Sequence, residues 1–250
     1  MSALNDYDFP NLKPADAESA GIQLRLQAAE EVLGFLDAQY GDPDEYLLFE
    51  DRVGYLDSDM AIHAFHIRYD HDAGTIRLRT AAQPTIALGM AWLVEHGASV
   101  SYFVQHGEDQ STPADAKSAA IARRIIASPG RYDIVDHGVE LSESWALLRD
   151  SDPRAADRPY LLHIEHIRDE GGFTLREGSF GSPQEAQAWL EVRDRSLPAA
   201  LAADTVVQVS AAASAARSRS TSAPTVRATS GVLPEPVRVS AVPAAGGPHR

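Results

Sequence analysis

Four histidines occupy similar places in two similar stretches of the chain, 61–96 and 160–195: His63, His66, His163 and His166. Imidazole is the commonest metal ligand and a frequent acid–base catalyst. Residues three apart on a strand point to opposite faces, so only His66 with His166, or His63 with His163, could meet between two related units. These four are the candidates for a catalytic or metal-binding pair. We favour the competing interpretation, in which they are strand residues kept from a common ancestor, and we predict no metal and no cofactor.

Five arginines in the same two stretches form the one basic cluster of residues 1–210: Arg68, Arg77, Arg79, Arg168 and Arg176. A guanidinium group can hold a phosphate or a carboxylate through two parallel hydrogen bonds, which makes these arginines the candidate binding residues. The alternative is that they form ion pairs with nearby carboxylates of the chain itself. Such pairs are common on protein surfaces, and we favour this alternative.

The two stretches belong to a longer internal repeat. From Arg79 and Arg176 onward they match without a gap at an offset of 97 residues. Further upstream, residues 14–22 recur at 113–121, at an offset of 99. Self-similarity over this length predicts that the chain contains an internal duplication.

Hydrophobic periodicity and turn residues predict the same order of elements in each copy. In the first copy we expect a helix over 14–40, strands over 46–49, 53–56, 62–69 and 75–80, a helix from Thr85 to about Gly97, and a strand over 99–105. In the second copy we expect a helix over 113–128, strands over 134–141, 145–148, 160–168 and 173–180, a helix capped by Ser182, and a closing strand over 205–209. This order predicts an α+β fold made of two copies of a helix–antiparallel sheet–helix unit.

The predicted domain organisation has four parts. Residues 1–13 form a flexible arm, 14–106 the first α+β copy, 113–210 the second copy, and 211–250 a tail. The tail consists mainly of Ala, Ser, Pro, Thr, Val and Arg and has no aromatic residue. Such a composition buries too little apolar surface to offset the entropy of ordering, so we expect the tail to be disordered.

Charge is distributed unevenly along the 250 residues, whose net charge is −14. The segment 211–250 holds five of the 22 basic residues and one of the 36 acidic ones, which leaves 17 basic and 35 acidic residues, a net −18, in 1–210. Such a charge disfavours nucleic acid and anionic membranes and favours basic partners. The chain has no cysteine, which excludes disulfides and thiolate chemistry. Since its first residues lack the pattern of a signal peptide, we expect a cytoplasmic protein.

Function is the least determined property. The motifs of phosphate-binding loops, dinucleotide-binding folds, zinc proteases and serine hydrolases are absent. We therefore expect an acidic, non-catalytic binding protein of the regulatory, immunity or anti-restriction type, which presents carboxylates to a protein partner and does not bind membranes. One alternative is a protein that binds nucleic acid through the hairpin arginines and the basic tail. Another is an enzyme with its site between the two copies, around the paired histidines.

Overall fold

The structure is a computed structural model. It describes residues 12–29, 31–51, 53, 54, 56, 60–105, 111–140, 143–193 and 195–200. All of these lie in one compact unit that spans residues 1–205. The tail 211–250, the closing strand predicted over 205–209 and most of the arm 1–13 fall outside the described residues.

The first half of the chain builds a five-stranded mixed sheet, here called sheet A, with the strand order β1-β5-β4-β3-β2. Its strands are β1 (Lys13–Pro14), β2 (Leu33–Gln39), β3 (Asp44–Asp51), β4 (Ile62–Asp70) and β5 (Thr75–Gln83). Strands β2 to β5 form an antiparallel meander, and the short β1 pairs in parallel with the start of β5. The strand β5 is thus covered by β1 only at Thr75 and Ile76.

Two helices cover the two faces of sheet A. Helix α1 (Ala17–Ala29) packs Ile22 and Leu26 against one face, in a core with Phe49, Phe65, Leu78 and other residues of alternate strand positions. Helix α2 (Ile86–Glu95) covers part of the opposite face. It approaches the strands so closely that a Cβ atom at Gly89 would lie 2.7 Å from a methyl group of Leu48.

The second half builds a four-stranded antiparallel sheet, sheet B, with the order β6-β7-β8-β9. Its strands are β6 (Tyr132–Glu140), β7 (Glu143–Asp150), β8 (Tyr160–Ile167) and β9 (Phe173–Phe180), with the 3-10 helix η4 (Pro153–Ala155) between β7 and β8. Helix α4 (Ala116–Ile126) covers one face and helix α5 (Pro183–Val192) the other. The short helix α3 (Val100–Gln105) lies between the halves in sequence.

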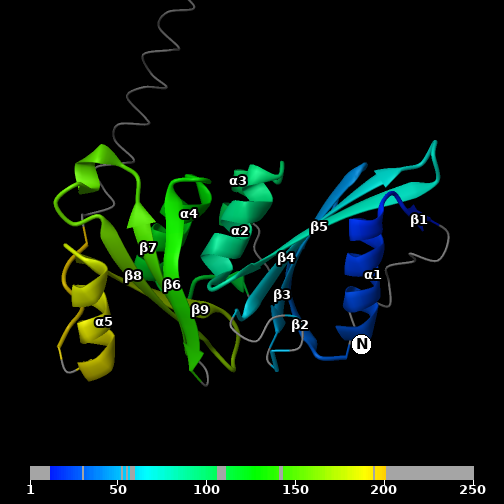
Figure 1. Ribbon diagram of the computed structural model, residues 1–250. Coiled ribbons are helices and arrows are strands. Elements are labelled where there is room, and N and C mark those ends of the chain that lie inside the picture. The colour runs from blue at the N-terminus through cyan, green and yellow to red at the C-terminus, as the bar shows by residue number, and fades with distance from the viewer. Residues whose placement is uncertain are drawn as a thin grey trace, which may run out of the picture. The chain divides into compact units, whose positions relative to one another are not determined.

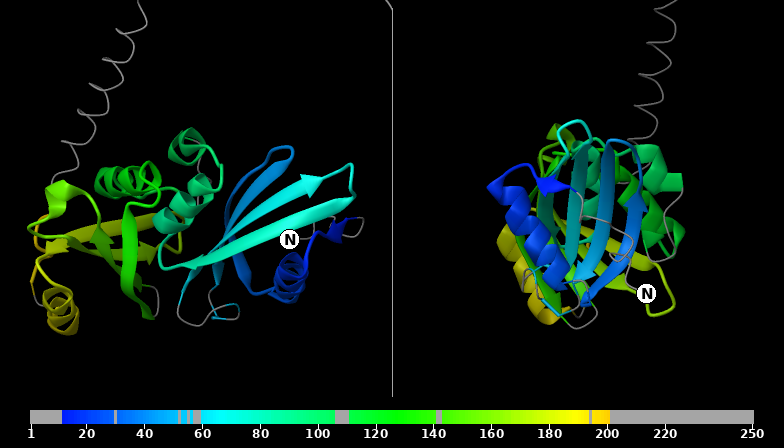
Figure 2. Two further views of the ribbon diagram at one scale, coloured as in Figure 1. Left: turned by 45° about the horizontal axis from the view of Figure 1, so that its top comes forward. Right: turned by 90° about the vertical axis from the view of Figure 1, so that its right-hand side faces the viewer.

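The two halves share one apolar core. Helices α2 and α4 lie between sheet A and sheet B, whereas α1 and α5 lie on the outer faces (Figure 1). Figure 2 shows α1 in front of the strands of sheet A when that side faces the viewer. The shared core joins Leu48 and Ile62 of sheet A through α2 and α4 to Leu148 and Phe173 of sheet B. None of the helices that the structure describes has the length and apolar character needed to span a lipid bilayer.

The two halves repeat several local contacts. Pro14 pairs in parallel with Ile76, and Pro113 makes a parallel bridge to Phe173. A β-bulge interrupts the register beside Asp37 in β2 and beside Asp136 in β6.

Side-chain bonds recur in the same way. The Ser19 hydroxyl accepts from the Leu78 amide at 3.0 Å, and the Ser118 hydroxyl accepts from the Leu175 amide at 2.9 Å. The internal duplication itself stays a prediction, and these correspondences support it.

The α+β fold class is confirmed, but three predicted elements are wrong. The helix expected over 14–40 ends at Ala29, and 33–39 is strand β2, because Gly34 disfavours a helix and the segment pairs with β3. The strand expected over 99–105 is helix α3. Of the strand expected over 53–56, residues 53, 54 and 56 are described and form no strand.

Candidate functional site

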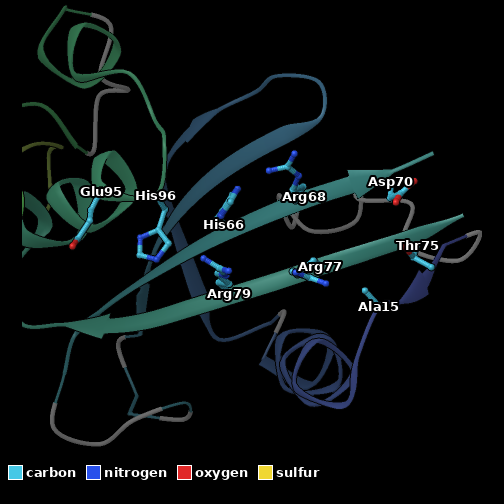
Figure 3. Close-up of a pocket in the computed structure, with 9 residues that line it drawn as sticks. All are labelled: Ala15, His66, Arg68, Asp70, Thr75, Arg77, Arg79, Glu95 and His96. Atoms are coloured by element: carbon cyan, nitrogen blue, oxygen red, sulfur yellow. The ribbon is translucent and has the colours of Figure 1, made fainter. Parts of the chain in front are cut away.

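A pocket of about 570 Å³ lies on the part of sheet A that α2 leaves uncovered, next to the C-terminal end of that helix (Figure 3). Most of its lining is polar or charged. The lining residues are Ala15, His66, Arg68, Asp70, Thr75, Arg77, Arg79, Glu95 and His96. Three of the five predicted binding arginines therefore come together here.

The strand register explains why these side chains share one face. Residues that stand opposite each other on neighbouring strands point to the same side of the sheet. His66 stands opposite Arg79, and Arg68 stands opposite Arg77. The four side chains form a square array of nitrogen-bearing groups, while the intervening Ile67 and Leu78 point to the α1 face and are buried.

Ion pairs within 4 Å are few at the guanidinium groups of this array, although Asp44 stands opposite Arg68 on β3 and Asp16 interacts electrostatically with Arg77 and Arg79. Arg77 has one carboxylate nearby, that of Asp16 at 3.7 Å, and both side chains are about half exposed. Neither Arg68 nor Arg79 forms an ion pair with any described residue. Like charges directly opposite each other on a sheet are unfavourable, so the facing pair Arg68 and Arg77 favours an anion between them.

His66 is held at the base of the pocket. Its Nε2 donates to the Asp44 carboxylate at 2.8 Å, and its ring stacks on Tyr46 with centroids 4.9 Å apart. Its Nδ1 is buried and has no hydrogen-bond partner in the described part of the chain. A buried nitrogen without a partner is rare in proteins.

His96 lies at the edge of the pocket on the helix side. Its Nδ1 donates to the Trp92 carbonyl at 2.8 Å, and its ring stacks on the Trp92 indole with centroids 3.9 Å apart. The sequence pattern does not link His96, Asp44 or Tyr46 to this site. Only their pairing with His66 across the sheet and across α2 brings them to this site.

The corresponding place in the second half holds no such array. Arg176, which the repeat aligns with Arg79, forms an ion pair with Asp115 at 2.8 Å. This contact and the capping bond from the Ser118 amide hold the pKa of the Asp115 carboxyl well below its usual range. The remaining predicted arginine, Arg168, pairs with Glu170. For these two arginines the structure agrees with the ion-pair alternative.

The four histidines are not equivalent in the structure, and that premise of the pairing was wrong. His163 stands opposite Glu177 on β9, whereas His66 stands opposite Arg79, the residue that aligns with Arg176. Counted from that arginine, His66 corresponds to Ile164, so the repeated His-Ile-Arg letters lie two residues out of register.

Their surroundings differ as well. His63 lies 3.7 Å from the Asp51 carboxylate on the α1 side of sheet A. His163 is fully buried and bonds Glu177 at 2.8 Å, and His166 is exposed. Within the part of the chain that the structure describes, no group of three or more His, Asp or Glu side chains could hold a metal ion.

No protein-family model, no curated protein and no solved structure matches this chain. What it does must therefore be argued from its own residues.

Proposed function

We propose that this protein is a non-catalytic binding protein whose pocket on sheet A holds an anionic group, a phosphate or a carboxylate. The observation that carries the proposal is the array of Arg68, Arg77, Arg79 and His66, in which two guanidinium groups form no ion pair within 4 Å among the described residues. The pocket volume of about 570 Å³ lies within the range of small-molecule sites.

The array suits an anion for a geometric reason. Guanidinium groups offer planar pairs of N–H donors, and charge-assisted hydrogen bonds to them are roughly twice as strong as neutral ones. Three arginines on two adjacent strands present such donors on one face of the sheet (Figure 3). Their backbones are fixed by the β4–β5 ladder, so little order remains to be imposed when an anion binds.

Several buried and half-buried carboxylates of the chain pair with its own histidines and arginines, both at this site and elsewhere. Asp44 orients His66, and Asp115, Asp150 and Glu177 each pair with an arginine. An acidic surface that binds a basic protein stays a separate prediction. The contacts described here favour arginine as the group that meets the ligand.

Calorimetric titration with inorganic phosphate and with acetate tests the proposal. In a buffer without other multivalent anions, we expect one phosphate to bind per chain. Arg68→Ala and Arg79→Ala should each weaken binding about tenfold or more, because a hydrogen bond to a charged group contributes roughly 1.5–3 kcal/mol. Arg168→Ala is the matched control, since that hairpin arginine pairs with Glu170 outside the pocket. Equal binding by all three variants, or none by the parent, would reject the proposal.

The same titration with a short DNA duplex addresses the nucleic-acid alternative. The net charge of −18 on residues 1–210 opposes association with a polyanion, and the basic pocket offsets it only locally. We expect the duplex to bind only weakly at low salt. At physiological salt this binding should disappear. Tight duplex binding that disappears in Arg79→Ala would favour the nucleic-acid alternative.

A further inference from the structure

The outer edge of β5 has a different environment from the outer edge of β9, its counterpart in the second half. At β9 an extended segment of the chain lies along the strand. The Ser179 amide donates to the Pro198 carbonyl at 3.3 Å, the Ser179 hydroxyl donates to the Ala199 carbonyl at 3.0 Å, and Gly178 makes an antiparallel bridge to Ala199.

At β5 no described residue pairs with the equivalent edge beyond Ile76. The repeat aligns Gly178 with Ala81 and Ser179 with Ala82. After α2 the chain turns instead toward the other edge of sheet A, where Tyr102 of α3 donates to the Ala38 carbonyl at 2.6 Å.

The strand register determines which backbone N–H and C=O groups of β5 point away from β4. The Leu78 amide points away from β4, because it donates to the Ser19 hydroxyl. Backbone groups two and four residues further along a strand point the same way. The N–H and C=O groups of Thr80 and Ala82 therefore face outward, and within the described residues no strand covers them.

Two pockets of opposite character flank this edge. On the α2 face, Arg77 and Arg79 of β5 line the pocket described above. On the α1 face lies a smaller pocket of about 170 Å³. Six of its nine lining residues are apolar and three are polar: Ile22, Leu26, Leu56, Phe65, Ala81 and Ala82, with Arg25, His63 and Thr80.

We propose that the Thr80–Gln83 edge of β5 binds an extended segment of a partner protein in which acidic and apolar residues alternate. The segment adds a strand to sheet A along the edge that corresponds to the one where Ala199 bridges Gly178 of β9. Successive side chains of a strand point to opposite faces, so acidic residues reach Arg79 while apolar residues enter the pocket beside Ile22 and Leu26. This inference rests on the proposed function, because the acidic side chains use the same arginines.

The probe is a six-residue peptide of alternating leucine and glutamate, acetylated and amidated at its ends and labelled for fluorescence anisotropy. We expect it to bind the full chain, and the same peptide with lysine in place of glutamate not to bind. Methylation of alternate backbone nitrogens, on the edge that pairs, should weaken binding at least about tenfold, since it removes strand hydrogen bonds and leaves the side chains unchanged. Ala82→Pro should have a similar effect by removing the outward N–H of Ala82.

The outcomes separate the two proposals. Equal affinity of the methylated and unmethylated peptides overturns the edge proposal. The edge proposal is also overturned if the glutamate peptide does not bind. If inorganic phosphate still binds in that case, and Arg79→Ala weakens its binding, the pocket proposal stands. Failure of both ligands overturns both. Slower hydrogen exchange of the Thr80 and Ala82 amides in the complex supports the edge directly and does not depend on any variant folding correctly.

Discussion

Arg68 on β4 stands directly opposite Arg77 on β5, and both side chains are exposed on the same face of sheet A. A facing pair of like charges costs stability, by an amount within the roughly 1 kcal/mol range of cross-strand effects. A protein can retain such a pair where an anion bridges it. The repulsion between the two arginines thus destabilises the protein without ligand, and a bound anion relieves it.

We expect Arg68→Thr to raise the free energy of unfolding slightly in anion-free buffer, by up to about 1 kcal/mol, because it relieves the facing charges. The same change should remove the rise in melting temperature that phosphate gives the parent, since a ligand stabilises only the state that binds it. Thermal melts with and without phosphate measure both effects. Arg149→Thr is the control, because Arg149 is an exposed strand arginine that faces Tyr160. A phosphate response equal to that of the parent would contradict the role of Arg68.

The sequence singled out four residues of the pocket, His66 and the three arginines, but did not predict that they form one site. The arginines Arg68, Arg77 and Arg79 were recognisable because a basic cluster stands out in an acidic chain. Which of the five arginines are free depends on whether a carboxylate such as Asp115 reaches them, and that is set by packing across the sheet. His96 was missed for the same reason, since only the position of α2 over sheet A brings it to the site.

In β4 the repeated letters of the sequence do not follow the strand register. There the letters His-Ile-Arg recur at an offset of 100, while the strand register requires 98. A slip of two residues keeps each side chain on its face of the sheet, so alternation of polar and apolar residues cannot reveal it.

We expect the first half, 14–105, and the second, 113–200, to superpose in an experimental structure with Arg79 on Arg176 and His66 on Ile164. The reason is that both hairpins share one register from that arginine onward. Superposition of the Cα atoms of β2 to β5 on those of β6 to β9 is the measurement. An overlay of His66 on His166 would contradict the register, and different strand orders would contradict the duplication.

Glu177 should stabilise the protein against acid. It lies buried between Arg124 and His163, which donates at 2.8 Å. Burial alone would raise its pKa, but the hydrogen bonds from His163 and Arg124 and the charge of Arg124 outweigh burial and lower the pKa to about 2. A carboxyl with a lowered pKa contributes stability above its ordinary pKa of 4.5, and that contribution is lost as the pH falls toward 2.

We therefore expect Glu177→Gln to destabilise the protein at pH 7 by roughly 3–5 kcal/mol, because it leaves the Arg124 charge buried without a partner. The difference from the parent should shrink as the pH falls below 4.5 toward 2. Urea unfolding over this range measures it, with the exposed Glu170→Gln as the control. A difference that stays constant with pH would show that the effect comes from packing and not from the charge.

Glu165 should affect the pH dependence of stability in the opposite direction to Glu177. It is a fully buried residue of β8 in the second half, and its carboxylate accepts from the amide of Ile86, the first residue of α2 in the first half, at 2.9 and 3.1 Å. Burial raises its pKa to about 8, and the nearby charge of Glu50 adds to this, although the amides at the start of α2 favour the charged form. The contact joins the two halves, so its protonation affects how they are held together.

A carboxyl with a raised pKa contributes stability that is fully present below its ordinary pKa of 4.5 and is lost as the pH rises through about 8. Over that range the parent should lose about 1.4 kcal/mol per pH unit through this group, because the unfolded chain releases a proton that the folded chain keeps. Glu165→Gln keeps an acceptor for the Ile86 amide and cannot ionise, so its stability should change less from pH 5 to pH 9. Urea unfolding of the parent, of Glu165→Gln and of the exposed control Glu191→Gln gives the three curves. Parallel curves for the parent and Glu165→Gln would mean that the buried carboxyl does not titrate in this range.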